Sequence, residues 1–226
     1  MSNTKLPKSM DRGFFISLEG GEGSGKTTQI NRLVKTLSEK GYEVVITREP
    51  GGTPESESIR DLLVQRGGGD WNAMSEILLL FAARSMHIEK FIEPALNDGK
   101  IVICDRFTDS TVAYQGNGRG SNIDTIKEVE RISINGFKPD LTFILDIDVR
   151  TGLERSNARL SADDAGDNTE DRFERLDIDF HERLREGFLS IARKDEGRCY
   201  ILNAAQSIDH LSDEIKNITL AKLQGE

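Results

Sequence analysis

A glycine-rich segment near the N-terminus has the spacing of a phosphate-binding loop. Residues 20–27 read Gly-Gly-Glu-Gly-Ser-Gly-Lys-Thr, which fits the pattern GxxxxGK[ST]. Glycines let backbone N–H groups turn inward around phosphate oxygens, and a helix that starts near Lys26 adds the positive end of its dipole. We therefore expect Lys26 to contact the β- and γ-phosphates of a nucleoside triphosphate, and the Thr27 hydroxyl to ligate Mg²⁺.

A phosphate loop by itself is shared by kinases, GTPases and motor ATPases. The sequence contains no NKxD-type motif that would recognise guanine. It also lacks the long second half that couples nucleotide hydrolysis to movement. A chain of 226 residues with one such loop therefore favours transfer of a phosphoryl group to a small acceptor.

Three arginines stand where the acceptor of such a reaction would bind. Arg48 and Arg106 follow strand-like segments, and Arg84 lies on a helical stretch. Ligands of α/β sheets bind beyond the carboxyl ends of the strands, and a guanidinium can hold a phosphate or a base edge with two hydrogen bonds. A lone arginine is more often a surface charge, but two at adjacent strand ends beside a phosphate loop favour an anion site.

Phe81, Asp105 and Glu22 each have more than one interpretation. Phe81 is three residues from Arg84 on a predicted helix, so its ring either stacks on a nucleobase or belongs to the core. Asp105 ends a strand, where its carboxylate can hold a Mg²⁺-bound water, orient Arg106 or cap the next helix. Glu22 lies in an anion-binding loop, so it must point away from the phosphates, toward a sugar hydroxyl or a metal-bound water.

Strand-like segments alternate with helical ones along the chain. The predicted strands are residues 13–19, 42–47, 100–105, 141–146 and 198–202. The predicted helices are residues 26–40, 55–65, 73–96 with a bend before Pro94, 109–115, 124–135, 149–159, 175–193 and 208–223. Residues 116–120 are expected to be loose, and residues 161–171 to form an acidic, polar loop. The alternation predicts an α/β fold, a parallel sheet with helices on both faces.

Composition and charge limit the class of protein. Thirty basic and thirty-nine acidic residues give a net charge of −9, which disfavours a broad nucleic-acid surface. The longest apolar stretch, residues 77–83, is too short to cross a membrane, and residues 1–12 lack the apolar core of a signal peptide. Cys104 and Cys199 have no metal-ligand spacing. We expect one cytoplasmic domain over residues 1–226, with residues 1–12 as a flexible tail.

The motifs together resemble those of the bacterial thymidylate kinases. The matching strings are EGGEGSGKTT at 19–28, TREPGGT at 47–53, FAAR at 81–84, DRF at 105–107, STVAYQG at 110–116, GRG at 118–120 and KPDLTFIL at 138–145. They occur in the family's order and spread over most of the chain. The phosphate loop is generic, whereas TREPGGT with DRF and AYQG is specific. Two departures are Phe107, where Tyr or His is familiar, and residues 161–171, which are longer and more acidic than the family's lid.

The resemblance implies a fold and a reaction. The fold is a five-stranded parallel sheet of the P-loop nucleoside-monophosphate kinase type, with a mobile lid at about residues 155–175. The reaction is transfer of the γ-phosphate of ATP to dTMP, giving dTDP, with Mg²⁺ and usually in a homodimer. A kinase for another nucleoside monophosphate or a deoxynucleoside stays open, as does a non-catalytic P-loop switch that binds a protein partner.

The resemblance also assigns residues to the donor and to the acceptor phosphate. ATP would bind the loop formed by Gly20, Gly21, Glu22, Gly23, Ser24, Gly25, Lys26, Thr27 and Thr28. Mg²⁺ would lie near Thr27 and Asp105. Arg48 and Arg106 would hold the dTMP phosphate, while Glu22 would meet the 3′-hydroxyl.

Further residues are implied around the nucleoside. Phe81 would stack on thymine and Arg84 would bond a thymine carbonyl. The residues expected near the base or sugar are Thr111 and Gln115 beside the base, Tyr114 against the sugar 2′ position, and Pro50, at a position that is often a cis-proline.

A cation is expected to stabilise the phosphoryl group during transfer, and it must come from outside the loop. Some thymidylate kinases carry an arginine directly after the loop acid, but this chain has Gly23 there. Arg155 and Arg159 lie four residues apart on a predicted helix that precedes the acidic segment. The resemblance implies that Arg159 approaches the ATP phosphates, with Arg155 supporting it and Arg172 as the second candidate. The alternative is a solvated helix whose charges pair with their neighbours.

Overall fold

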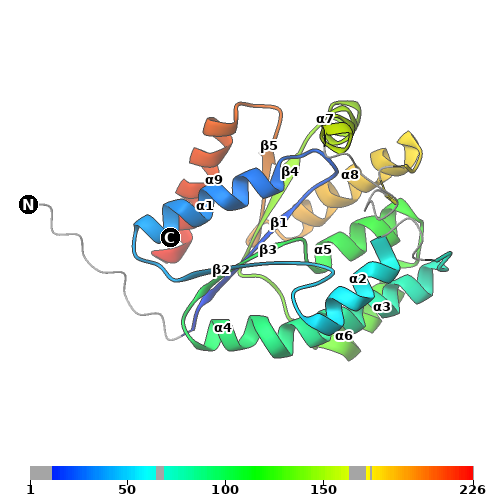
Figure 1. Cartoon of the computed structure of the whole chain (residues 1–226), viewed down its shortest axis with the longest axis horizontal. Coiled ribbons are helices and arrows are strands. Elements are labelled where there is room, and N and C mark those ends of the chain that lie inside the picture. The colour runs from blue at the N-terminus through cyan, green and yellow to red at the C-terminus, as the bar shows by residue number, and fades with distance from the viewer. Residues whose placement is uncertain (1–11, 65–68, 163–171, 174, 226) are drawn as a thin grey trace, which may run out of the picture.

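A five-stranded parallel β-sheet forms the centre of the computed structural model (Figure 1). The structure describes residues 12–64, 69–162, 172–173 and 175–225. The strands run in the order β2-β3-β1-β4-β5. Their bounds are β1 Phe14–Glu19, β2 Val44–Arg48, β3 Ile101–Asp105, β4 Leu141–Asp146 and β5 Cys199–Asn203. All neighbouring strands pair in parallel, which confirms the predicted α/β class.

Helices cover both faces of this sheet. The described α-helices are α1 Lys26–Glu39, α2 Pro54–Val64, α3 Ala73–His87, α4 Glu93–Asn97, α5 Thr108–Thr111, α6 Ile123–Ile134, α7 Val149–Ala162, α8 Ile178–Lys194 and α9 Ile208–Leu223. Two further segments are π-helical, η1 Ile88–Ile92 and η2 Val112–Gly118. Alternate residues of each strand point to opposite faces, so each face has its own apolar core.

The two cores are built from different helices. Leu33 of α1 and Leu211 of α9 pack with Ile16 and Leu18 of β1 on one face. On the other face the ring of Phe15 joins a cluster with side chains of η1, α4 and β3. Because β1 is buried on both faces at the centre of the sheet, the loop that follows it starts from a fixed position.

The predicted helix over residues 73–96 is interrupted before Pro94. The chain forms α3, then the π-helical η1, then α4, which has Pro94 in its first turn. Proline has no N–H and its ring clashes with the carbonyl one turn earlier, so a regular helix cannot pass through it unchanged. In place of a regular helix, the structure has a π-helical turn directly before the turn that contains Pro94.

The prediction that residues 116–120 are loose is wrong for most of the segment. η2 continues the helical path of α5 through Gly118. A Cβ at Gly118 would lie 2.5 Å from Cε2 of Phe180, and one at Gly116 would lie 2.7 Å from Cδ1 of Ile123. These glycines therefore permit close packing of η2 against α8 and α6 rather than loosening the chain.

Other helix ends differ slightly from the prediction. α8 begins at Ile178, three residues later than expected, because the Asp177 carboxylate accepts a hydrogen bond from the Phe180 N–H at 2.7 Å and caps the helix. α7 extends to Ala162, beyond its predicted end. Most of the predicted acidic loop and of the predicted tail, residues 163–171 and 1–11, lies outside the described residues. Among the described helices, none has the length and apolar character needed to cross a membrane.

Candidate active site

A cleft of about 670 Å³ opens at the carboxyl ends of β1, β2 and β3. The loop after β1 forms one wall with Glu22, Gly23, Ser24, Gly25, Lys26, Thr27 and Thr28. The opposite wall contains Arg48, Pro50, Arg84, Thr111, Tyr114 and Gln115. Asp105 and Arg106 lie in the same cleft. The structure thus brings both groups of predicted residues together in one space.

The phosphate loop curls around the ammonium group of Lys26. Lys26 Nζ donates to the carbonyl oxygens of Gly20 at 3.0 Å and Gly21 at 3.2 Å, and lies 3.4 Å from Ser24 Oγ. α1 starts at Lys26, directly after Gly25, whose φ of 89° is a left-handed conformation that favours glycine. The N–H groups at the helix start and this cation form an anion-binding site.

The Lys26 ammonium is partly destabilised in the protein without bound phosphate. Burial, together with the positive charge of Arg106, lowers the pKa of Lys26 to about 8, although Asp105 and Glu22 oppose the shift. An anionic phosphate beside Lys26 would favour the charged form and raise this pKa again. Binding of phosphate and protonation of Lys26 are therefore linked.

Arg106 connects the loop to the opposite wall. Its Nη1 donates to the Gly20 carbonyl at 2.9 Å, and its Nη2 pairs with the Glu22 carboxylate at 3.1 Å. The guanidinium lies 4.9 Å from the ring centre of Tyr114, whose hydroxyl donates to the same carboxylate. Arg106 has a φ of 73°, in a region that non-glycine residues rarely adopt. This turn directs the guanidinium back across the end of β3 toward the loop.

The neighbours of Glu22 favour the ionised form of its carboxyl group. Burial by itself would raise the pKa of Glu22, but Arg106, Lys26 and the Tyr114 hydroxyl outweigh it and hold the pKa below its usual value. The carboxylate therefore faces positive groups and a hydroxyl donor. This arrangement explains how an acid is accommodated in a phosphate-binding loop.

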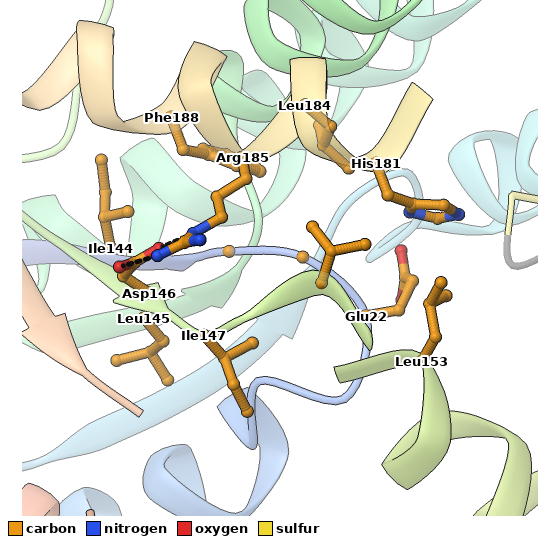
Figure 2. Close-up of a pocket in the computed structure, with 13 residues that line it drawn as sticks. Glu22, Ile144, Leu145, Asp146, Ile147, Leu153, His181, Leu184, Arg185 and Phe188 are labelled. Atoms are coloured by element: carbon orange, nitrogen blue, oxygen red, sulfur yellow. Dashed lines mark hydrogen bonds and ion pairs between the residues drawn. The ribbon is translucent and has the colours of Figure 1, made fainter. Parts of the chain in front are cut away.

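A smaller cavity of about 30 Å³ lies behind the loop (Figure 2). Gly20 and Gly21 form part of its wall. In Figure 2 the Glu22 carboxylate points toward the ring of His181 from α8. Arg185 of the same helix pairs with Asp146 at the end of β4 at 2.6 Å. Residues of α8 and of the loop therefore line the same cavity.

Thr27 and Asp105 present oxygen atoms to the same cleft. Thr27 is exposed at the start of α1, and Asp105 ends β3. Hydroxyl and carboxylate oxygens are the ligands that Mg²⁺ prefers, and this ion usually keeps several waters and substrate oxygens. These residues fit such an ion. No group of three or more His, Cys, Asp or Glu side chains forms a metal site within the described part of the chain.

The buried acid Glu19 was missed by sequence reasoning, although it precedes the loop. Burial, reinforced by the charge of Asp109, raises the pKa of Glu19 to about 8. Its carboxyl oxygens accept hydrogen bonds from the Phe107 N–H at 2.7 Å and the Ser110 hydroxyl at 2.5 Å. Glu19 thereby fixes the turn that carries Arg106. Its position at the end of a buried strand was the only available signal.

Arg84 is held on the opposite wall by a buried network. Its Nε donates to the Glu49 carboxylate at 2.6 Å and its Nη2 to the Thr111 hydroxyl at 3.0 Å. Nη1 has no hydrogen-bond partner among the described residues. The His87 ring also bonds Glu49, at 3.0 Å. The Nη1 amino group of the guanidinium, with its two N–H donors, is therefore left for a ligand of the cleft.

The expectation that Phe81 offers a ring face to a base is corrected by its burial. Phe81 is 1% exposed and packs with Ile77 and Ile126. The Arg84 guanidinium lies 4.7 Å from the centre of its ring, so Phe81 supports Arg84 from the core side. Leu80, one residue earlier, lines the cleft instead.

Aromatic surface in the cleft comes from other residues. Phe173, located after the acidic segment, lines the cleft and packs edge-on against Tyr114, with ring centres 5.1 Å apart. Phe107 is fully buried and contacts the ring of Phe15 at 5.0 Å. Position 107, which carries no hydroxyl, is thus part of the apolar core on this face of the sheet.

The end of β2 and the helix α2 each place one cation at the cleft. Arg48 is exposed and pairs with Glu57 of α2 at 3.0 Å. The Glu49–Pro50 peptide bond is cis, as expected. Arg60 of α2 donates to the Pro50 carbonyl at 2.8 Å and lines the cleft. Sequence reasoning missed Arg60 because an arginine on a helix with several charges is usually solvated.

Arg155 and Arg172, two of the three candidate lid arginines, contact different parts of the fold. Arg155 of α7 lines the cleft and donates to the Ala204 carbonyl at 3.1 Å. The side chain of Arg159 lies outside what the structure describes. Arg172 bonds the Glu76 carboxylate at 2.6 Å and the Leu63 carbonyl at 2.8 Å. The structure therefore places Arg172 against α2 and α3, not at the phosphate loop.

The absence of a side chain at Gly23 allows α7 to approach the phosphate loop closely. A Cβ at Gly23, whose φ is 66°, would collide with the carbonyl oxygen of Gly152 in α7. A Cβ at Gly152 would lie 2.6 Å from the Glu22 carbonyl oxygen. The two glycines let the backbones of helix and loop touch, which leaves no room for an arginine at position 23.

The fold and the cleft define a P-loop protein with a second anion-binding wall facing its phosphate loop. Comparison with known proteins identifies one family. Residues 18–215 match the thymidylate kinase family. A thymidylate kinase of Caulobacter vibrioides is 45% identical over 95% of this chain and 99% of its own length. A thymidylate kinase of Geotalea daltonii is 43% identical over 94% of this chain and 99% of its own length.

Solved structures agree with this similarity. The crystal structure of thymidylate kinase from Ehrlichia chaffeensis has a TM-score of 0.71 and 38% sequence identity, and the match covers 92% of this chain and 98% of that one. The chain belongs to the thymidylate kinase family. Its reaction is the ATP-dependent phosphorylation of dTMP, and the alternative activities are not favoured.

The pKa of Lys26 predicts a pH-dependent affinity for ATP. The side chain is charged below about pH 8 in the free protein. A bound phosphate should keep it charged to higher pH, because the negative charge favours the protonated form. Affinity should be constant from pH 6.5 to 7.5 and then weaken, approaching tenfold per pH unit above about 8. Titration calorimetry at pH 8 should also detect proton uptake on binding. Lys26→Arg should remove both effects, because arginine stays charged. An affinity that is flat to pH 9.5 in the unmodified protein would contradict the linkage.

Leu80 and Phe81 should respond differently to truncation. Leu80→Ala should raise the KM for dTMP several-fold and leave the KM for ATP unchanged, because Leu80 lines the acceptor wall. Phe81→Ala should instead lower the free energy of unfolding by about 3 kcal/mol, the usual cost of emptying a buried aromatic site. Urea denaturation and steady-state kinetics measure the two effects. A stable Phe81→Ala protein with a selectively raised KM for dTMP would restore the stacking role to Phe81.

Proposed function

We propose that the chain catalyses this reaction within the single cleft, with ATP on the loop side and dTMP on the arginine side. The observation that supports this most is the shared space: the phosphate loop and a second set of cationic side chains line one cleft. A nucleotide switch has no need of the second set. Both substrates are metabolites of the cytoplasm, so we expect the enzyme to act there.

The donor site consists of the loop and the groups that surround it. Backbone N–H groups at the start of α1 and the Lys26 ammonium bind the ATP phosphates. Mg²⁺ would be held through Thr27 and Asp105, and when bound it neutralises charge on the phosphates. Arg106 approaches from β3 and stabilises negative charge on the transferred group.

The acceptor phosphate is held by arginines on the other side. Arg48 and Arg106 bind it, and Arg60 is a third cation in the same part of the cleft. Arg106 contacts the loop and the acceptor wall, so it aligns the two substrates for in-line transfer. Glu22 accepts a hydrogen bond from the sugar 3′-hydroxyl, and the Tyr114 ring fills the space of a 2′-hydroxyl.

Base recognition follows from the acceptor wall. Arg84 Nη1, which has no hydrogen-bond partner among the described residues, donates to a thymine carbonyl. Thr111 and Gln115 lie beside it on the continuous helical stretch of α5 and η2. Leu80 provides apolar contact with the ring, in the role that the sequence pointed to for Phe81.

A homodimer is proposed through the surface of α2, α3 and α6. Large apolar side chains are exposed on these contiguous helices, Leu62, Met74, Leu78 and Ile132. Met74 and Leu78 are four residues apart and share a face of α3. Such exposed apolar groups are typical of an interface between copies. A monomeric mass by light scattering at micromolar concentration would contradict this proposal.

Analysis of the reaction products tests which nucleotide accepts the phosphoryl group. The protein should convert ATP and dTMP into ADP and dTDP in equal amounts, with a kcat/KM for dTMP that exceeds those for UMP, dCMP and thymidine. ADP formation and chromatography of the acceptor measure both products. ATP turnover that does not depend on dTMP would favour a switch or another activity.

The lid cation is assigned to Arg159. α7 contacts the loop through Gly152, and Arg155 of the same helix lines the cleft one turn before Arg159. Arg159→Ala should lower kcat about tenfold or more at saturating ATP and dTMP, with little change in dTMP affinity, because the charge acts in the transition state. Arg150→Ala, on an exposed position of the same helix, is the control. A kcat that is unchanged in Arg159→Ala but collapses in Arg172→Ala would move the role to Arg172.

A further inference from the structure

One buried carboxylate beside the cleft has no role in the reaction described above. Glu76 of α3 is 1% exposed. Its oxygens accept hydrogen bonds from Arg172 Nη2 at 2.6 Å and Gln115 Nε2 at 3.3 Å, and Arg119 Nη1 pairs with it at 3.2 Å. A carboxylate this deeply buried is stable only with such partners.

The partners of Glu76 come from separate parts of the chain. Gln115 and Arg119 belong to η2 and its C-terminal end, whereas Arg172 follows the acidic segment. Arg172 also bonds the Leu63 carbonyl in α2. Glu76 therefore joins the acceptor wall to the chain that returns from the lid.

The contact with Glu76 determines which way the Gln115 amide faces. An ionised carboxylate can only accept hydrogen bonds, so the amide nitrogen of Gln115 must be the atom that approaches it. The amide oxygen, Oε1, is then directed to the opposite side. Gln115 lines the cleft, so the amide presents an acceptor there.

Arg84, a hydrogen-bond donor, lines the same cleft as Gln115. Arg84 Nη2 bonds Thr111, which lies one helical turn before Gln115, and Arg84 Nη1 has no partner in the described residues. The Watson–Crick edge of thymine carries an N3–H donor next to the O4 acceptor. Cytosine has the reverse pattern, an N3 acceptor next to an N4–H₂ donor.

We propose that Glu76 is a positioning residue for base selection. It fixes the Gln115 amide so that the oxygen accepts from thymine N3–H while Arg84 donates to O4. Cytosine in the same place would leave an acceptor facing an acceptor and a donor facing a donor, which is costly in a buried site. The inference rests on the proposed acceptor site, because it requires Arg84 and Gln115 to contact the base.

Glu76→Gln tests the proposal. A neutral amide at position 76 can donate or accept, so Gln115 is no longer held in one orientation. The ratio of kcat/KM for dTMP to that for dCMP should fall tenfold or more, mainly through KM, while the KM for ATP stays the same. Gln115→Ala should lower the ratio by a similar factor. Adding Glu76→Gln to Gln115→Ala should produce no further fall.

Controls separate positioning from support of the fold. Arg172→Lys keeps a cation beside Glu76 and should leave the dTMP-to-dCMP ratio unchanged. An equal loss of activity on both nucleotides in Glu76→Gln, with an unchanged ratio, would overturn the proposal. A further fall of the ratio in the double variant would overturn it too, since Glu76 would then act without Gln115.

A second variant keeps the test decisive if Glu76→Gln does not fold. Glu76→Asp retains the charge beside two long arginine side chains but withdraws the oxygens from Gln115. It should also lower the dTMP-to-dCMP ratio, and an unchanged ratio in this folded variant would contradict the proposal. Absence of dTMP phosphorylation by the unmodified protein would instead reject the proposed function itself.

Discussion

The guanidinium of Arg106 joins the donor loop to the acceptor wall, and the rest of the site is arranged around it. It bonds the Gly20 carbonyl and the Glu22 carboxylate while lying against the Tyr114 ring. The turn that directs it there comes from the left-handed backbone conformation of Arg106 at the end of β3. The buried Glu19 stabilises this turn by accepting a hydrogen bond from the Phe107 N–H. Because β3 is hydrogen-bonded to β1 and β2, these contacts have a rigid base. Phosphoryl transfer needs aligned donor and acceptor oxygens, and in the proposed mechanism Arg106 is already in place to align them.

On its other side, the phosphate loop is in close backbone contact with α7. This contact limits which residues can place a cationic side chain near the loop. Gly23 and Gly152 bring α7 against the loop, and neither position tolerates a side chain. A loop arginine is therefore sterically impossible, which is consistent with a cation supplied from α7. The same contact places Arg155 on the cleft. The absence of a side chain at position 23 and the position of Arg155 at the cleft thus both follow from the contact between α7 and the loop.

The sequence predicted the architecture and the position of the phosphate loop between β1 and α1 well, for identifiable reasons. Alternation of apolar strands with amphipathic helices defines a parallel sheet, and the phosphate loop owes its shape mainly to local glycine and lysine chemistry. Buried network residues were harder to predict. Glu76 has the residue type of a solvated helix position, and only the fold shows that three side chains converge on it.

Helical periodicity also left one assignment undetermined. It groups residues by face but does not say which face borders the cleft. Leu80 and Phe81 differ by about 100° around α3, so one faces the cleft and the other the core. The glycines of residues 116–118 were misread for a related reason. They resemble a flexible loop in sequence, whereas the fold uses them to admit Phe180 and Ile123.

The central claim is that donor and acceptor occupy one continuous cleft, end to end. A ligand that links adenosine to thymidine through a chain of five phosphates tests it most directly, in a calorimetric titration with competition. The account predicts one binding site per chain, an affinity well above that of either nucleotide alone, and displacement by both ATP and dTMP. Displacement by only one of the two, or simultaneous binding of the linked ligand and dTMP, would contradict it.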